Sequence, residues 1–504
     1  MTAGCARGPA PCSGRLLALC ALLACAAGPA RAGETRTTPG GRGYSDLVAV
    51  VHLHSTVGDG LASPAELARA ARLAGVDALV ITDHFLERVA YAPWPIGNVI
   101  GVALSRPSVM SRGTRKYLQA LAAAEEETGT LVLPGIEVSP YARWTGSLLT
   151  RSLRLEGWHR HVLVIGIEDS QALARLPAAG NRAGGRYGAG SILYLLPAAA
   201  LAWSASRAAR PVYHETRLRN FRLRRRRLPI AAGLVGAAAL GLLVAGFPFR
   251  VESFSAVAAD PGEAPFRLLE DRVHELGGFI AWAHPEAAAE KRALGVRLET
   301  PPYPGLILKT DADAFGALPE GVKSLLPAGG LWDQALLDHV EGRRRSAPFA
   351  LAELDDHRAA RDIDLGSLQT VLRVRERSHA GMLEAMKGGR MYGRWTPDRK
   401  PPLRLVEWSA DAPGAATVVS GETLHARGPV TIRLAVGGGD GAPAVARLVR
   451  AGDVIWTQRS VPPFTAAIQD DAPGATSYRL DVEGAYPYRL ISNPIFVVRT
   501  VEGA

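Results

Sequence analysis

Short apolar runs that end in polar residues alternate with helix-like segments in the first part of the chain. Residues 47–51 (LVAVV) form one such run, and residues 77–82 form another. Between them, Ser63 and Pro64 begin a segment with helical periodicity, because serine is a favoured N-cap and proline suits the first helical turn. The pattern predicts a strand, a helix and a strand, with polar residues at both strand ends. Parallel α/β proteins build their sites at this edge.

The pattern changes after Pro401. Several segments there alternate apolar and polar residues with a period of two, and Gly, Pro and Asp turns separate them. They begin at Leu403, Val430, Tyr478 and Ile495. Such strands predict a small β-sandwich over residues 401–504. We expect it to pack on the preceding domain, with substrate or partner binding as the alternative role.

Two longer apolar stretches interrupt the middle of the chain. Residues 188–206 and 228–249 are both uncharged, and the second is long enough to cross a bilayer once. Residues 207–228 between them contain nine arginines and one glutamate. A short Arg-rich loop marks the cytoplasmic side of a membrane protein, so the pattern predicts a transmembrane hairpin with both flanks outside. The alternative is a pair of buried core helices.

The N-terminus has the pattern of a secretory signal peptide over residues 1–32. Arg7 and Arg15 precede an apolar run, and Ala-Arg-Ala at 30–32 is a cleavage site. A lipid anchor on Cys25 is the alternative. All four cysteines lie within the first 25 residues, so a cleaved chain has neither disulfides nor thiolate metal sites. The predicted location is the inner (cytoplasmic) membrane, with the folded domains on the periplasmic side and membrane lipid as a partner.

The charge of the chain is concentrated in these two segments. The formal net charge is +10, of which +3 lies in residues 1–32 and +8 in residues 207–228. The remainder is near neutral, whereas nucleic-acid binding needs basic residues spread over a folded face. We therefore expect no nucleic-acid partner. A hydrophobic content of 47% with 21% charged residues excludes a disordered chain.

Histidines and carboxylates follow the apolar runs. In an H-x-H pair on a strand, both imidazoles lie on one face. Imidazole and carboxylate ligands together suit Zn²⁺, Mn²⁺ or Fe²⁺, and the number of candidates indicates more than one metal ion. The motifs in chain order are His52-Leu53-His54, Asp59-Gly60, Asp83-His84, Glu137, His159-Arg160-His161, His284-Pro285 and Asp355-Asp356-His357.

This series resembles the PHP family, named for polymerase-associated and histidinol-phosphatase domains, over residues 46–400. The resemblance implies a distorted seven-stranded β/α barrel with two or three divalent transition metal ions (Zn, Mn or Fe) at the strand carboxyl ends. Residues 385–392 are also similar to the exported, carbaryl-hydrolase-like branch. The metal ligands that the resemblance implies are His52, His54, Asp59, His84, Glu137, His161, His284, Asp355 and His357.

The sequence departs from the family pattern in two places. A Glu-Leu pair at 353–354 replaces the usual Gly-Ser, and the spacing favours Asp355 over Asp356 as the ligand. His159 competes with His161 for one position. His161 is favoured because it directly precedes an apolar run.

The resemblance implies a metal-dependent hydrolase, and a phosphoesterase that uses a metal-activated water is the predicted activity. Asp355 is predicted to bind metal and accept the proton of the water, and Glu137 to bridge two metal ions. Arg160 and Arg358 are candidates to bind the substrate anion, with an ordinary surface role as the alternative. A carboxylic ester or carbamate hydrolase is a second interpretation. A non-catalytic metal-binding sensory or partner-binding membrane protein is a third, and the complete ligand set favours an enzyme acting on a small-molecule phosphoester or ester.

The predicted fold class is α/β: a PHP-type barrel interrupted by a two-helix transmembrane hairpin and followed by a β-sandwich. Ligands on both sides of the insertion must meet in one site, so the insertion must cross the membrane an even number of times. The predicted domains are the signal peptide (1–32), the first part of the barrel (46–180), two transmembrane helices (188–206 and 228–249) around an Arg-rich cytoplasmic loop (207–228), the second part of the barrel (250–400) and the sandwich (401–504).

Overall fold

The computed structural model describes most of the chain after the predicted signal peptide. The described residues are 43–91, 102–147, 150–210, 212–218, 221–227, 229–293 and 296–500. The predicted signal peptide and all four cysteines lie outside these ranges.

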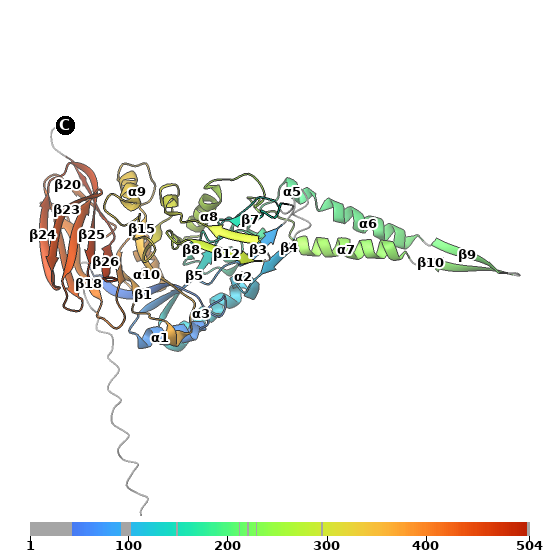
Figure 1. Cartoon of the computed structure of the whole chain (residues 1–504), viewed down its shortest axis with the longest axis horizontal. Helices are drawn as coiled ribbons and strands as arrows, with labels where there is room; N and C mark the ends of the chain where they lie inside the picture. Colours follow the sequence, from blue (N-terminus) through green and yellow to red (C-terminus); the bar gives the residue numbers. More distant parts are fainter. Residues whose placement is uncertain are drawn as a thin grey trace, which may run out of the picture. The chain divides into compact units, whose positions relative to one another are not determined.

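Seven strands close into a barrel (Figure 1). Neighbouring strands are parallel except at β8, which runs antiparallel to both β5 and β11. The ring closes where β15 pairs with β1. The predicted seven-stranded α/β barrel is confirmed. In order around the ring, the strands are β1 (Ser45–Leu53), β2 (Ala78–Ile81), β5 (Leu131–Val138), β8 (Val162–Ile165), β11 (Phe279–Trp282), β14 (Ala314–Leu318) and β15 (Phe349–Asp356).

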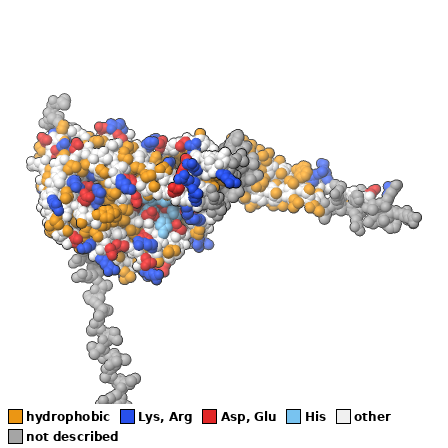
Figure 2. Space-filling view, in the orientation of Figure 1, with side chains coloured by type: hydrophobic (Ala, Val, Ile, Leu, Met, Phe, Trp, Pro, Cys, Tyr) orange, Lys and Arg blue, Asp and Glu red, His pale blue; other side chains and the backbone are white. Residues whose placement is uncertain are grey.

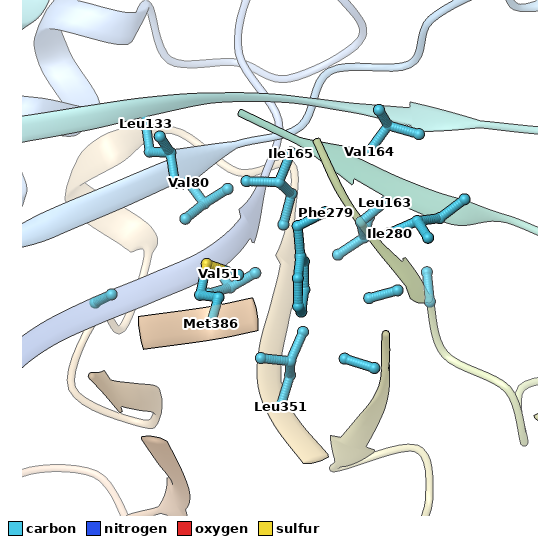
Figure 3. Close-up of a cluster of buried hydrophobic side chains, with 14 of the residues drawn as sticks. Val51, Val80, Leu133, Leu163, Val164, Ile165, Phe279, Ile280, Leu351 and Met386 are labelled. Carbon is cyan, nitrogen blue, oxygen red and sulfur yellow. The ribbon is translucent and has the colours of Figure 1, made fainter. Parts of the chain in front are cut away.

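The short barrel strands are apolar because both of their faces are buried. Every residue of β2, β8 and β11 is buried. Helix α10 (His379–Lys387) covers one end of the barrel, where Leu383 contacts Gly166 and Lys387 bonds the Gly277 carbonyl. Figure 3 shows apolar side chains gathered from the strands with Met386 of α10, including Val51, Val80, Leu133, Ile165, Phe279 and Leu351.

Helices lie between successive barrel strands in the chain. The predicted helix after Ser63 is α1 (Pro64–Leu73), and it begins with a capping box in which the Ser63 and Glu66 side chains each bond the other's backbone N–H. The others include α3 (Thr114–Thr128), α8 (Ala264–Glu275) and α9 (Leu331–Val340). Each buries an apolar face.

The barrel sheet continues into the C-terminal domain. β16 (Leu368–Val374) pairs with β1, and the sheet then runs through β17 (Met391–Trp395), β26 (Arg489–Ser492), β25 (Gly474–Glu483), β22 (Ala444–Arg450) and β23 (Asp453–Ser460). A second sheet has the order β19 (Val418–Val419), β18 (Leu403–Asp411), β21 (Val430–Gly438) and β24 (Phe464–Asp470). Both sheets contribute to one apolar core, including Trp408 and Leu434 from one and Leu448 and Leu480 from the other.

Buried polar contacts join the C-terminal strands to the barrel. Arg479 of β25 makes a two-pronged ion pair with Asp333 of α9, both N···O distances being 2.6 Å. Asn493, which follows β26, bonds both the N–H and the carbonyl of Ala350 in β15. The C-terminal domain therefore shares hydrogen bonds with a strand that carries candidate ligands.

The insertion between β8 and β11 contains a pair of apolar helices, α6 (Leu195–Ala209) and α7 (Ile230–Gly246). They lie side by side in Figure 1, and Ser204 bonds the carbonyl of Ala232 across their contact. Small residues let the helices approach, because a Cβ on Gly236 would lie 2.4 Å from the Ser204 hydroxyl.

The structure differs from the sequence expectation at two points in this insertion, the second apolar stretch and the Arg-rich segment. The segment Ala189–Ala209, in which a turn at residues 193–194 separates α5 (Ala189–Ile192) from α6, is the single candidate membrane span by length and composition among the described residues. The second apolar stretch gives a helix of only 17 residues. It ends at Gly246 because Pro248 lacks an N–H and disfavours helix at Phe247. The Arg-rich segment, predicted as a loop, pairs as β9 (Val212–Leu218) with β10 (Phe221–Arg227).

Smaller sheets lie outside the barrel. β12 (Ala289–Ala293), β13 (Val296–Thr300), β7 (Arg154–Glu156) and β6 (Arg143–Thr145) form one, in that order. β3 (Arg88–Tyr91) and β4 (Val102–Ser105) form another. Both follow strand ends that carry candidate ligands.

Candidate metal centre

The predicted ligands meet at one end of the barrel. His52 lies in β1, His84 follows β2, and Asp355 lies near the end of β15. His161 precedes β8 rather than following it, but the antiparallel direction of β8 brings its start to the same end. Strand polarity therefore collects residues that are hundreds of positions apart in the sequence.

Backbone strain accompanies this convergence. His52, His284 and Asp355 have positive φ values of 69°, 29° and 48°. The pairing of β1 with its neighbours shifts register between Val51 and Leu53, so His52 occupies a bulge. Such conformations cost energy in non-glycine residues and are typical of functional sites.

Glu137 lies at the centre of the cluster, where its two carboxylate oxygens face different histidines. Its Oε1 atom is 2.6 Å from Nδ1 of His161 and 3.1 Å from Nε2 of His284. Its Oε2 atom is 2.9 Å from Nδ1 of His84 and 3.4 Å from Nε2 of His54. A carboxylate divided in this way has the geometry of a bridge between two cations.

Two further carboxylates line the outer part of the cluster. Asp59 lies 3.3 Å from Nε2 of His357 and 3.7 Å from Nε2 of His84. Asp355 lies 3.6 Å from Nε2 of His54 and 3.8 Å from Nδ1 of His357. The side chains of Asp355 and His357 are 38% and 37% exposed, whereas that of His54 is fully buried. Figure 2 shows where histidine side chains reach the surface beside acidic ones.

The donor atoms fit metal ions better than they fit one another. Nε2 of His52, both ring nitrogens of His54 and Oε2 of Glu137 are buried without a hydrogen-bond partner. Two ligands bound about 2.1 Å from a tetrahedral ion lie about 3.4 Å apart. Nε2 of His52 and Oε1 of Glu137 are separated by 3.4 Å. In four overlapping groups, one donor atom from each residue lies within 4.8 Å of the others, namely His54-Asp59-His84-His357, His52-His54-Asp355, His84-Glu137-His161 and His159-His161-His284.

Burial and the carboxylates shift the pKa values of the cluster in opposite directions. Burial lowers the pKa of His54 and of His161 to about 4, so both are neutral at pH 7, the form that binds metal. Burial also acts to lower the pKa of His84, but the Glu137 carboxylate outweighs it and raises that pKa to about 9. Burial favours a raised pKa for Glu137, yet the surrounding histidines hold it well below its usual value. Glu137 is therefore ionised throughout the neutral range.

A second layer of polar residues orients the candidate ligands, and the sequence interpretation missed it. Glu353 lies 3.1 Å from Nδ1 of His52 and accepts the backbone N–H of His284. The Tyr303 hydroxyl lies 3.2 Å from Nδ1 of His284 and donates to the carbonyl of Ala283. Partners of this kind fix which ring nitrogen faces the metal. Glu353 was visible in the sequence only as a departure from the family pattern.

Asp83 orients the loop that carries Asp59. Its carboxylate accepts the backbone N–H groups of Ser55 and Gly58 and the Ser55 hydroxyl. The glycine of the Asp59-Gly60 motif is required by space, because a Cβ there would lie 2.2 Å from the His54 carbonyl oxygen. The Asp83-His84 motif thus combines a loop anchor with a candidate ligand.

The structure distinguishes Asp355 from Asp356 and places both His159 and His161 in the cluster. Asp355 faces the histidines, whereas Asp356 pairs with Arg358 through contacts of 3.0 and 2.9 Å. Arg358 is thus already engaged by a carboxylate. His159 and His161 both lie in the cluster, with ring centroids 4.5 Å apart.

Comparisons with known proteins found solved structures that are similar to this chain at low sequence identity. The chain resembles a two-domain protein from Bacteroides vulgatus containing a predicted PHP-like metal-dependent phosphoesterase, with 12% identity, a TM-score of 0.37 and coverage of 90% of this chain and 95% of that one. It also resembles a candidate metal-dependent phosphoesterase from Bifidobacterium adolescentis, with 16% identity, a TM-score of 0.20 and coverage of 47% and 67%. An amidohydrolase from Chromobacterium violaceum matches with 18% identity, a TM-score of 0.26 and coverage of 62% and 89%.

No family model and no curated protein matches this chain. The PHP-like description of the Bacteroides protein agrees with the resemblance seen in the motifs, and the carbaryl-hydrolase-like branch is not represented.

Proposed function

We propose that this chain is a PHP-type metal-dependent phosphoesterase. The observation that carries the proposal is the divided Glu137 carboxylate with buried, unpartnered histidine nitrogens around it. Divalent cations held there would polarise a phosphoryl oxygen and lower the pKa of a water molecule. Zn²⁺, Mn²⁺ and Fe²⁺ suit this donor set.

The residues at the mouth have separate proposed roles. Asp355 is half exposed beside His52 and His54, so it is proposed to hold a cation and to accept the proton of the attacking water. Arg160 stands between His159 and His161 in the sequence, its side chain packs against Gly157, and its Nε atom is buried without a hydrogen-bond partner. Arg160 is proposed to bind the oxygens of a phosphoryl group, because a guanidinium favours an anionic phosphoester over a neutral carboxylic ester. Arg358 is less available, because Asp356 already pairs with it.

We also propose that α6 and α7 anchor the enzyme in the inner membrane, with the barrel on the periplasmic side. Supporting this, Leu195, Ile230, Leu234 and Val244 are each more than 60% exposed. An exposed apolar surface of this kind is typical of a site that contacts lipid or another protein. The 17 residues of α7 span about 25 Å, near the lower limit for one crossing.

Metal content tests the enzyme proposal most directly. Plasma mass spectrometry on the detergent-purified protein is expected to give two or three transition metal ions per chain. The double variant His52→Ala, His284→Ala is expected to lose them together with hydrolysis of p-nitrophenyl phosphate. His274→Ala is the matched control, because His274 pairs with Asp313 rather than with the cluster. Sub-stoichiometric metal that the double variant retains contradicts the proposal and favours a binding or sensory protein.

A further inference from the structure

We propose that the substrate is a lipid phosphate, a phosphoester carried by a membrane-resident amphipathic molecule. The inference rests on the proposed function, since it takes the barrel as a phosphoesterase and α6 and α7 as its membrane anchor. It comes from the place where the insertion joins the barrel. The two segments that connect the barrel to α6 and α7, residues 179–188 and 249–257, are called the stem below.

The stem is bound to the end of the barrel that carries the candidate ligands. The backbone N–H of Ala179 donates to the carbonyl of Ser139 at 3.0 Å. Ser139 is two residues after Glu137 in the chain. Arg88, four residues after His84, donates to the carbonyl of Gly180. Two residues of extended chain span about 7 Å. The stem therefore lies beside the cluster, and α10 covers the opposite end of the barrel.

Aromatic rings and arginines lie together in the stem and at Tyr194, which directly precedes α6. The Arg250 guanidinium lies over the Tyr187 ring at 5.4 Å, and Arg182 donates to the hydroxyl of Tyr194. The rings of Tyr194 and Phe249 are 5.2 Å apart. Aromatic rings with adjacent cations are typical of the headgroup level of a bilayer. With α6 and α7 in the membrane, this level lies beside the ligand end of the barrel.

An apolar wall continues from the stem to the histidines. Its base is the buried cluster Trp144, Leu153, Leu155 and Leu298, and its open side is formed by Trp158 and by Val257 of the stem, which are half-buried and pack against that cluster. The Trp158 ring lies edge-on to the His159 ring at 5.2 Å, and His159 stacks on His161. For a lipid phosphate, the half-buried Trp158 and Val257 would contact the apolar portion, while the metal ligands receive the phosphate.

The reaction is a hydrolysis. The oxygen of water bonds to phosphorus, the bond between phosphorus and the lipid oxygen breaks, and that oxygen takes a proton. The products are a lipid alcohol, which stays in the bilayer, and inorganic phosphate, which leaves in water. No further reactant is needed.

The test compares two substrates that share a phosphate and differ in their acyl chains. The full-length protein, loaded with Mn²⁺ and reconstituted in phosphatidylcholine vesicles, is assayed with phosphatidic acid in the same vesicles and with glycerol 3-phosphate in solution. We expect kcat/KM to be at least tenfold higher for phosphatidic acid. Trp158→Ser is expected to lower the ratio of the two values about tenfold, and Val257→Ser tests the stem side of the wall if the first variant does not fold. Val454→Ser, at an exposed position on β23, is the control.

The outcomes separate the two proposals. An equal or higher kcat/KM for glycerol 3-phosphate in the wild type overturns the lipid substrate and leaves the phosphoesterase intact. A ratio that both wall variants leave unchanged overturns the role of the wall. Hydrolysis of neither substrate by protein that holds its metal ions overturns both proposals together.

Discussion

The carboxylate of Glu353 lies 3.1 Å from Nδ1 of His52, and both side chains are almost completely buried. The other oxygen of Glu353 accepts the backbone N–H of His284 at 2.6 Å. One carboxylate therefore connects three barrel strands, and it leaves Nε2 of His52 directed at Glu137 and Asp355. The orientation of the cluster depends on this contact.

Space for Glu353 comes from Gly316 in β14, so Gly316→Ala is expected to damage the metal centre from a distance. A Cβ at position 316 would lie 1.7 Å from Oε1 of Glu353. Displacing a carboxylate that orients a ligand typically costs about tenfold in metal affinity. Metal titration followed by mass spectrometry measures this loss. Gly305→Ala is the control, because no heavy atom lies within 4 Å of its added Cβ. Equal affinity in both variants contradicts the role given to Glu353.

His379 is expected to stabilise the fold in acid more than in base. Its ring lies 2.9 Å from Glu168 and 2.7 Å from Glu125. Burial acts to lower its pKa, but these two carboxylates outweigh burial and raise it. The stabilisation is therefore complete below the unfolded pKa of about 6.5 and is lost as pH rises through the higher folded value.

The variant His379→Gln tests this linkage. Its thermal midpoint is expected to fall below that of the wild type at pH 5.5, by an amount equivalent to about 1 kcal/mol or less. At pH 9 the difference in thermal midpoint between the variant and the wild type should be smaller, because His379 is then less protonated. Circular dichroism melts at both pH values measure it. A difference that is constant with pH shows that His379 acts through packing alone.

Removing one partner of the buried Arg479–Asp333 ion pair is expected to lower the free energy of unfolding more than replacing both partners by apolar residues. Their side chains are 1% and 3% exposed. Arg479→Met leaves Asp333 buried without its cation, which typically costs about 3–5 kcal/mol. The double variant Arg479→Met, Asp333→Leu removes both charges and should recover much of that loss. Denaturant midpoints compare the three proteins. A double variant as unstable as the single one contradicts the electrostatic explanation.

The membrane topology can be tested with single cysteines. The native cysteines at positions 5, 12, 20 and 25 are replaced by serine, and one cysteine is then introduced. Tyr486→Cys, at a position that is 86% exposed, is expected to react with an impermeant maleimide in intact spheroplasts. Arg222→Cys, between the two helices, should react only after the membrane is opened. Labelling of both positions in intact spheroplasts contradicts a hairpin that crosses the bilayer.

Local patterns predicted six of the seven barrel strands and the order of the candidate ligands, but missed β14 in a segment interpreted as an insert with short helices. Strands such as β2 and β8 are continuous apolar runs because both faces are buried. The regular strand geometry expected for His52 and His54 is not kept, because His52 occupies a bulge and His54 follows the end of β1. The roles of Glu353 and Tyr303 could not be predicted in this way. Each depends on a partner from another strand or loop, and no local spacing records such a contact.

The insertion was predicted less well for a related reason. The apolar run to Phe249 gave the composition of a membrane helix, but Pro248 ends the helix earlier. Arginine content indicated a loop between the helices, yet β9 and β10 pair along their whole length. Backbone pairing overrides charge composition here, since side-chain charge does not determine where main-chain hydrogen bonds form.

The closure of the barrel by β1 and β15 sets an order of events during synthesis. His52 and Glu353 are 301 positions apart, and α6 and α7 are made between them. A chain emerging from its N-terminus first therefore presents both apolar helices long before the final strand of the ring exists. A ribosome stalled after α7 would hold a chain without His284, Asp355 and His357. Both apolar helices are thus complete before the chain contains all of the candidate ligands.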